Sequence, residues 1–266
     1  MNWLFAMRSL RDGDLATFAR NTEACLAAFE RIGEVRNTSS QRINLGYAYA
    51  ELGAFDRAEE LLRRVYRDCE RVGIPMVCAY AMQNLGNVLR AMGRLEEARE
   101  QERRATAIGE QIGDRRIEGA ARAYGALMTL ELGDPVTAEA QCELAIRALE
   151  KNPPLLGFAR SVLARSFLVR GRAEEAVAQS REALAIVGDG VEDGETFIRL
   201  THIEALEATG DHEGALALAL EAEKRLRGRA ARIHDDALRA SFLERVPESK
   251  KTLEVAARLG SSVRSR

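Results

Sequence analysis

Two stretches of sequence decide the fold: NLGYAYAELGAFDRA at residues 44–58 and NLGNVLRAMGRLEEA at residues 84–98. Both have glycine at the third and tenth positions and alanine at the last. The tenth-position glycine belongs to a series with intervals of 38 to 40 residues: Gly13, Gly53, Gly93, Gly133, Gly171 and Gly210. Because a fixed period of this length indicates a repeat architecture, we expect six copies of one structural unit.

Each copy is expected to contain two helices. Apolar residues recur at helical spacing, as in Ala58, Leu62 and Val65. A second glycine series marks another turn: Gly33, Gly73 and Gly113. A glycine just beyond a helix end adopts the left-handed conformation without a Cβ penalty, so both series predict helix stops. The unit is therefore helix, tight turn, helix and short link.

The composition also favours helices. Aromatic residues make up only 5% of the chain and there are five prolines, whereas strands are rich in aromatic and β-branched residues. We therefore expect an all-α chain. The six predicted units cover about 1–35, 36–75, 76–114, 115–153, 154–190 and 191–227, and capping helices with a tail fill 228–266. A final helix starting at Pro247 would cover the apolar end of the last unit.

The two quoted stretches resemble the first helix, the turn and the start of the second helix of tetratricopeptide repeats. The resemblance pairs Gly46 with Ala58 and Gly86 with Ala98, since small residues let two helix axes approach closely. It covers roughly residues 3–227 and implies a right-handed superhelical α-solenoid of antiparallel helix pairs. In later copies the first glycine is replaced by Ala126, Ala164 or Ile203.

The length of the period narrows the resemblance. A period near 40 residues is most similar to the long-repeat class of LGN/Pins-like scaffolds and MalT-like bacterial regulators. Residues 229–260 resemble the end of the tetratricopeptide region in large bacterial serine/threonine kinases and related regulators. Because the first copy starts at about residue 3, with no cap before it, the chain is interpreted as a fragment or a reduced relative of a longer protein.

The resemblance also places candidate binding residues, because the first helix of each tetratricopeptide pair lines the concave face. These residues lie there or at its edge: Asn44, Tyr47, Gln83, Asn84, Asn87, Arg90, Tyr124 and Arg165. Amide side chains can donate to and accept from an extended peptide, and arginine can clamp a carboxylate. The alternative is that Asn44 and Asn84 satisfy backbone groups between helices.

Two functional hypotheses follow. The first is a regulatory protein-interaction module or scaffold in signalling, which binds a peptide or helix in the concave groove. The second, implied by the MalT-like resemblance, is a ligand-sensing domain of a bacterial kinase or transcription regulator, with a small-molecule effector inside the superhelix. A groove would be long and open, whereas a sensor would have one enclosed pocket with convergent polar groups.

No motif indicates catalysis. The chain lacks GxSxG, GxxxxGK[ST], HExxH and a kinase catalytic loop. The acidic pairs Glu59-Glu60, Glu96-Glu97 and Glu174-Glu175 recur at the same place in three units, so they are interpreted as solvated helix starts that the helix dipole favours. We expect a protein that is not an enzyme, with no catalytic residues and no cofactor.

Neither a metal site nor a disulfide framework is expected. Cys25, Cys69, Cys78 and Cys142 form no CxxC pair and lie far from the histidines in sequence, so they are interpreted as small core residues. The formal net charge is -2, and the basic run KRLRGRAAR at 224–232 has no interleaved aromatics. That run is interpreted as a solvated helix end, with no nucleic-acid partner.

The N-terminal residues give the last expectations. Arg8 and Arg11 follow the short apolar start too closely for a signal peptide, and no stretch approaches the roughly 18 apolar residues of a membrane span. We therefore expect a cytoplasmic protein with no membrane partner. Trp3, Leu4 and Phe5 could mediate self-association through the N-terminal end, or form the surface that a missing cap would cover.

Overall fold

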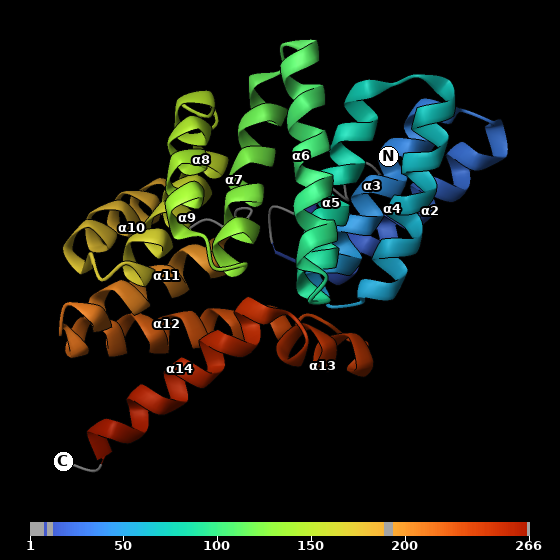
Figure 1. Ribbon diagram of the computed structural model, residues 1–266. Helices are drawn as coiled ribbons and strands as arrows, with labels where there is room; N and C mark the ends of the chain where they lie inside the picture. The colour runs from blue at the N-terminus through green and yellow to red at the C-terminus, as the bar shows by residue number, and fades with distance from the viewer. Residues whose placement is uncertain (1–7, 10–12, 189–193, 265–266) are drawn as a thin grey trace.

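The computed structural model describes residues 8–9, 13–188 and 194–264 (Figure 1). The all-α prediction is confirmed, because the described residues form helices and no strand. The helices are α2 (Leu15–Ile32), α3 (Val35–Glu51), α4 (Phe55–Val72), α5 (Pro75–Ala91), α6 (Leu95–Ile112), α7 (Arg115–Glu131), α8 (Pro135–Ala148), α9 (Pro153–Val169), α10 (Ala173–Val187), α11 (Glu195–Ala208), α12 (His212–Ala230), α13 (Asp236–Glu244) and α14 (Pro247–Arg264). Each helix from α2 to α12 packs against its neighbour in sequence, which makes a solenoid of antiparallel pairs.

The predicted glycine turns are present. Gly53 and Gly93 adopt the left-handed conformation, with φ of 73° and 79°, and the chain then re-enters a helix at Phe55 and Leu95. Proline and acidic residues begin several of the other helices. Asp134, for example, caps α8 by accepting a hydrogen bond from the backbone N–H of Thr137 at 3.0 Å.

Helix pairs approach closely at small residues, as expected, although the contacts differ in detail. A Cβ at Gly46 would lie 2.8 Å from the side chain of Leu62, not against Ala58. A Cβ at Gly86 would meet the carboxylate of Glu102 first, at 2.2 Å. In both pairs the space beside the glycine is filled by the residue one turn after the repeat alanine: Leu62 after Ala58, and Glu102 after Ala98.

The C-terminal helices close the solenoid. Figure 1 shows α12, α13 and α14 crossing below the other helices, with α13 returning toward the N-terminal half. Phe242 of α13 is buried in one apolar cluster with Leu52 and Phe55, and the Ser241 hydroxyl donates to the Gly53 carbonyl at 3.1 Å. The second unit is thus packed against residues almost 190 positions later.

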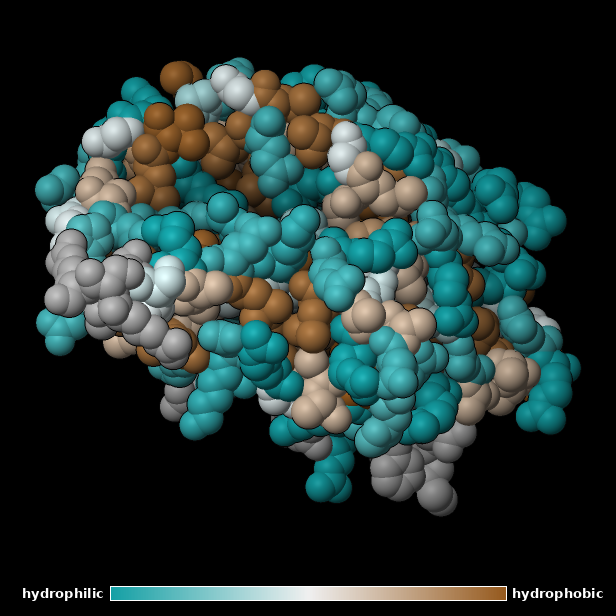
Figure 2. All heavy atoms as spheres, turned by 90° about the horizontal axis from the view of Figure 1, so that it is seen from below, coloured by the Kyte–Doolittle hydropathy of each residue, from teal (hydrophilic) through white to brown (hydrophobic). Residues whose placement is uncertain are grey.

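Helix α14 also begins at Pro247, as predicted, and packs on the last repeat. Ala256 and Leu259 share a buried apolar cluster with Leu200 of α11 and Ala219 of α12. Figure 2, which views the molecule from below, shows mainly hydrophilic side chains on this face, with apolar atoms in smaller areas among them. The closing helices therefore turn their apolar side chains inward.

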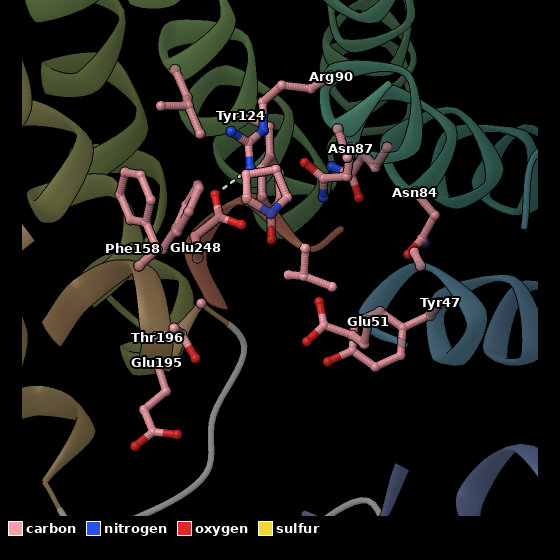
Figure 3. A pocket seen from close by; sticks show the side chains of 18 of the residues that line it. Tyr47, Glu51, Asn84, Asn87, Arg90, Tyr124, Phe158, Glu195, Thr196 and Glu248 are labelled. Carbon is pink, nitrogen blue, oxygen red and sulfur yellow. Dashed lines mark hydrogen bonds and ion pairs between the residues drawn. The ribbon is translucent and has the colours of Figure 1, made fainter. Parts of the chain in front are cut away.

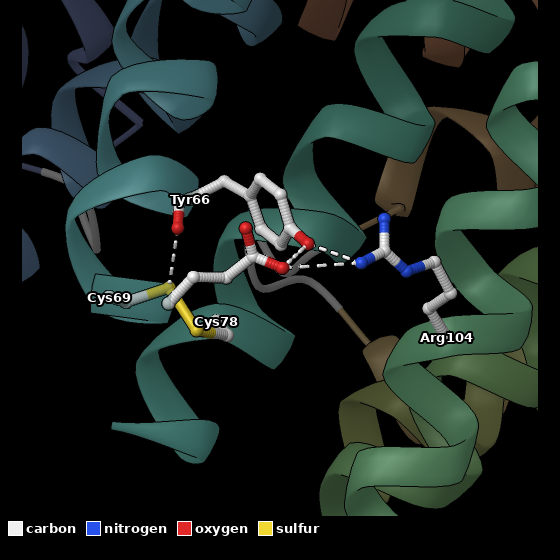
Figure 4. The surroundings of a disulfide bond; sticks show 5 residues. Tyr66, Cys69, Cys78 and Arg104 are labelled. Carbon is white, nitrogen blue, oxygen red and sulfur yellow. Dashed lines mark hydrogen bonds and ion pairs between the residues drawn. A yellow bond between two sulfur atoms is a disulfide. The ribbon is translucent and has the colours of Figure 1, made fainter. Parts of the chain in front are cut away.

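All four cysteines are buried, as expected of core residues, but the expectation that none forms a disulfide is wrong. Cys69 and Cys78 form a disulfide, with their Cα atoms 5.6 Å apart (Figure 4). The turn at Gly73 reverses the chain between α4 and α5, so two cysteines nine positions apart come together without a CxxC motif. Cys25 and Cys142 are free and buried, as expected of packing residues.

The acidic helix starts are only partly solvated. Glu59 accepts from Arg94 of the next unit at 2.8 Å and from Arg63 of its own helix at 2.8 Å, so it links two units.

The expected self-association residues Trp3, Leu4 and Phe5 lie outside the described residues. None of the helices described here is long and apolar enough to cross a membrane.

Candidate functional site

A pocket of about 440 Å³ lies on the inner side of the closed solenoid. First helices of consecutive units supply most of its walls, and α12, α13 and α14 close it. Its lining includes Tyr47, Glu51, Tyr80, Gln83, Asn84, Asn87, Arg90, Arg116, Tyr124, Phe158, Glu195, Thr196, Phe197, Arg229, Phe242 and Glu248. Figure 3 shows several of them around one space, among them Asn87, Arg90, Tyr124, Phe158 and Glu248.

Six of the eight candidate residues line this pocket. They are Tyr47, Gln83, Asn84, Asn87, Arg90 and Tyr124. Asn44 is not part of the lining, which begins on α3 at Tyr47. Arg165 is also outside it, because its guanidinium donates to Thr201 at 3.0 Å and pairs with Glu204 at 3.2 Å, both on α11.

Helix α5 forms the polar wall, but two of its amides have structural partners. Gln83 donates to the carbonyl of Ile117 at 2.9 Å and joins α5 to α7. The Asn84 amide nitrogen donates one N–H to the Tyr80 carbonyl at 2.9 Å, so part of its hydrogen-bonding capacity is used within α5. Asn87 lines the pocket, and no hydrogen bond ties its amide to another described residue. Asn87 is therefore the amide best suited to a ligand.

Arg90, at the end of that wall, is held by two acids. One Nη donates to Glu131 of α7 at 2.7 Å and the other to Glu248 of α14 (Figure 3). Burial alone would raise the pKa of Glu248, but the Arg90 guanidinium outweighs burial and holds that pKa below its ordinary value. Arg90 thus ties the repeats to the closing helix, a role that the groove hypothesis did not include.

An aromatic wall faces the amides. The ring of Phe158 lies 4.5 Å from that of Tyr124 and 5.2 Å from that of Phe197, measured between centroids. The three rings come from α7, α9 and α11. Tilted aromatic rings at these distances form a stable apolar surface, on which an apolar or aromatic group can rest.

The floor contains a buried carboxylate within a cluster of arginines. Glu195 is only 4% exposed and accepts from Arg199 at 2.9 Å and Arg225 at 2.8 Å. Arg229 lies 3.8 Å from the same carboxylate and 4.0 Å from Glu51. The interpretation of the basic run as a solvated helix end is therefore wrong for Arg225 and Arg229, which neutralise acids of the pocket.

Another part of the pocket lining carries a positive charge, at Arg116. Arg116, in the first turn of α7, is exposed and donates to the Tyr80 hydroxyl at 2.9 Å. Within the described part of the chain, no acidic side chain pairs with its guanidinium. Since Glu51, Glu195 and Glu248 all face arginines, the lining leaves positive charge available at this end.

Sequence reasoning missed the residues that the closing helices and α11 supply. Glu248, Arg229 and Phe242 lie outside the repeat period, so periodicity gave no signal for them. Glu195 begins α11 beside a helix-start glycine, Gly194, and looks like an ordinary first-turn acid in sequence. Among the described residues, no three His, Cys, Asp or Glu side chains lie together so as to hold a metal ion.

Comparison with protein families gives two matches. Models described as tetratricopeptide repeat match residues 39–111 and residues 157–182. The first match covers α4, α5 and most of α3 and α6, and the second spans the α9–α10 turn. No curated protein sequence matches the chain.

Several solved structures share the fold at low sequence identity. The apo form of RapI is 13% identical with a TM-score of 0.66, and the alignment covers 97% of this chain and 98% of RapI. A Rap protein complexed with Competence and Sporulation Factor is 13% identical, with a TM-score of 0.68 and coverage of 99% and 75%. The Rap conjugation gene regulator of plasmid pLS20, in complex with the Phr* peptide, is 14% identical, with a TM-score of 0.68 and coverage of 97% and 73%.

Proposed function

Because the chain is a tetratricopeptide-repeat protein, we propose that it is a regulatory interaction module whose closed pocket binds a short peptide in extended form. One observation carries the proposal: the Asn87 amide and the Arg116 guanidinium, each without the partner that its neighbours have, line one pocket with an aromatic wall. Among the described residues, Asn87 has no side-chain hydrogen bond and Arg116 contacts Tyr80 but pairs with no acid, so both suit a ligand.

The chemistry of the pocket matches an extended peptide. The Asn87 amide can bind one residue of an extended peptide twice: it donates to the backbone carbonyl of that residue and accepts from its backbone N–H. Phe158 and Tyr124 offer a surface for one apolar side chain. Arg116 favours an acidic group, such as a terminal carboxylate, at the open end.

The size of the pocket favours a short segment over a helix. Its volume of about 440 Å³ falls in the range of pockets that enclose small ligands. A helix lying along the repeats would need the space in which α13 and the start of α14 pack. We therefore propose a peptide of a few residues, and not the helix that an open groove would accept.

Two of the structural relatives support a peptide ligand. Both are Rap proteins in complex, one with Competence and Sporulation Factor and one with the Phr* peptide. By analogy we propose a signalling role in a bacterial cytoplasm, without catalytic activity. A link to a kinase or transcription regulator is part of the same proposal.

A small-molecule effector is the second candidate. The observation that favours it is that α12 to α14 complete the lining, so that polar groups from several helices converge on the pocket. A thermal-shift screen of metabolites distinguishes the two, since a small effector raises the melting temperature in the absence of any peptide.

The test of the peptide proposal is selection of random hexapeptides displayed on phage against the intact protein, followed by fluorescence polarisation with a synthetic copy. Asn87→Ala should weaken the selected peptide about tenfold, through loss of amide hydrogen bonds. Asn44→Ala is the matched control, because Asn44 is the same residue type on a first helix outside the lining. Equal effects of the two substitutions would remove Asn87 from the site.

A further inference from the structure

The disulfide lies beside a second hollow. Cys69, near the end of α4, and Cys78, in the first turns of α5, line a depression of about 450 Å³. On α5 this hollow is lined by Pro75, Cys78 and Met82, whereas the ligand pocket uses Tyr80, Asn84 and Asn87. The same helix thus has the disulfide on one side and the amide wall on another.

The hollow brings a reagent up to the disulfide, whose two cysteines are themselves buried, at 2% and 6% exposed. Its walls are apolar at Ile74 and Ile108, and Arg103 and Arg104 lie at its rim. Thiol–disulfide exchange requires an in-coming thiolate to reach a sulfur atom, so access controls the rate. Arg104 pairs with Glu70, which also lines the hollow, and Arg103 pairs with Glu100. The two free cysteines are buried elsewhere, so neither competes for this disulfide.

The surroundings would keep the two helices together without the covalent bond. Val65, Val77 and the two cysteines share one buried apolar cluster. Figure 4 shows a second, non-covalent connection: the Arg104 guanidinium of α6 donates to the Tyr66 hydroxyl of α4 and lies 5.0 Å from that ring. Reduction is therefore expected to loosen the junction between units and not to unfold them.

We propose that Cys69–Cys78 is a redox modification site, at which a dithiol enters the hollow and opens the disulfide reversibly. The thiolate of the dithiol attacks Sγ of Cys78, the more exposed of the pair; the S–S bond breaks and Cys69 leaves as a thiolate, which takes up a proton. The second thiol of the reagent then attacks the mixed disulfide and releases Cys78. Two electrons and two protons pass from the dithiol to the protein, and the dithiol becomes a disulfide.

Reduction of the disulfide would change the ordering of helix α5. This helix begins at Pro75 and carries Asn84, Asn87 and Arg90 into the ligand pocket. The disulfide fixes its first turns to the preceding unit, so reduction frees the start of the helix that bears the amide wall. Cys69–Cys78 thus couples the redox state of the surroundings to the ordering of α5, whatever ligand the pocket takes.

The experiment uses the intact oxidised protein in dithiothreitol buffers of graded reduced-to-oxidised ratio, with alkylation and peptide mass spectrometry. Cys69 and Cys78 should become alkylated together under native conditions, while Cys142, which is fully buried, reacts only after denaturant is added. Amide hydrogen exchange over residues 75–91 should rise about fivefold on reduction, with α7 unchanged. Alkylation of Cys69 and Cys78 only together with Cys142, or unchanged exchange over 75–91, would overturn the proposal.

Access through the hollow has its own test. Ala107 is exposed and lines the hollow, so Ala107→Trp fills it without disturbing the core. The rate of reduction by dithiothreitol should fall about fivefold, because the thiolate loses its path to the disulfide. Ala140→Trp, at an exposed position on α8, is the matched control and should leave the rate unchanged. Equal rates in both variants would contradict entry through the hollow.

Discussion

The helix pairs α3–α4 and α5–α6 share the repeat glycines and alanine but differ at most other positions, and their contacts differ as well. In α3–α4, Leu62 fills the space beside Gly46, and Gly53 contacts the closing helix α13. In α5–α6, a carboxylate takes the place of that leucine: Glu102 is 1% exposed and neither of its oxygens has a hydrogen-bond partner among the described residues. Both pairs contact the closing helices, the first at Gly53 and the second at Arg90, but the second buries an acid without a hydrogen-bond partner among the described residues and supplies the polar wall.

This difference shows how a repeat protein gains a site without changing its fold. The period fixes the turns and the small contact residues in both pairs. The positions that differ, such as Ala50 against Arg90 on equivalent turns of α3 and α5, decide which pair forms an ion pair with α14. Substitutions that make one pair resemble the other therefore test the assignment.

The largest loss of stability is expected when Arg90 of α5 is replaced by alanine, the residue at the equivalent position of α3, Ala50. Arg90→Ala leaves Glu248 and Glu131 without their cation, and removal of one partner from a buried pair costs about 3–5 kcal/mol in the free energy of unfolding. Urea denaturation measures it. Adding Glu248→Gln should recover part of the loss, because the carboxylate that lost its partner is gone; a double variant as unstable as the single one would contradict the pairing.

The Arg90 pair also has a pH dependence. The pKa of Glu248 is lower in the folded protein than its ordinary value, so its contribution is present above that ordinary pKa and is lost as pH falls through the folded value. The stability difference between the wild type and Glu248→Gln should therefore shrink on acidification. Denaturation curves between neutral and acidic pH check this, and a difference that grows toward acid would reverse the assigned sign.

The next largest difference in stability is expected between alanine substitutions at the two equivalent turn glycines, Gly53 and Gly93. Gly53→Ala and Gly93→Ala both force a side chain into the left-handed conformation, at about 1–2 kcal/mol. Only at Gly53 would the new Cβ meet the backbone of Ser241, 2.6 Å from its carbonyl oxygen; nothing lies within 4 Å at Gly93. Gly53→Ala should lose about 1–3 kcal/mol more through that overlap. Equal losses would mean that α13 does not pack on this turn.

Replacing the buried acid should stabilise the protein. Glu102→Leu makes α6 like α4 and removes a carboxyl without partners, with an expected gain of about 1–3 kcal/mol at neutral pH. Burial raises the pKa of Glu102 well above its ordinary value, so the folded state keeps a proton that the unfolded state releases. Wild-type stability should therefore fall as pH rises from the ordinary pKa to the folded one, and Glu102→Leu should lose that dependence.

The sequence predicted the features that follow from the repeat period and from local helix and turn signals. The turn glycines, the helix pairs and six of the eight candidate residues follow from the register of α3, α5 and α7. Arg165 does not line the pocket, because its guanidinium meets Thr201 and Glu204 of α11, a contact that depends on how later units pack. Glu248 and Phe242 could not be placed, since the contact between α13–α14 and the second unit is set by the whole superhelix. The Cys69–Cys78 disulfide was foreseeable, because a predicted turn lies between the two residues.

Photo-crosslinking tests the central claim most directly. Tyr124, in the pocket, and Tyr66, on the outer helix α4, are each replaced by p-azidophenylalanine, a similar aromatic side chain. The selected hexapeptide is then added and the mixture is irradiated. The account predicts a peptide adduct at position 124 and none at position 66. An adduct at 66 with none at 124 would show that the peptide binds outside the closed pocket.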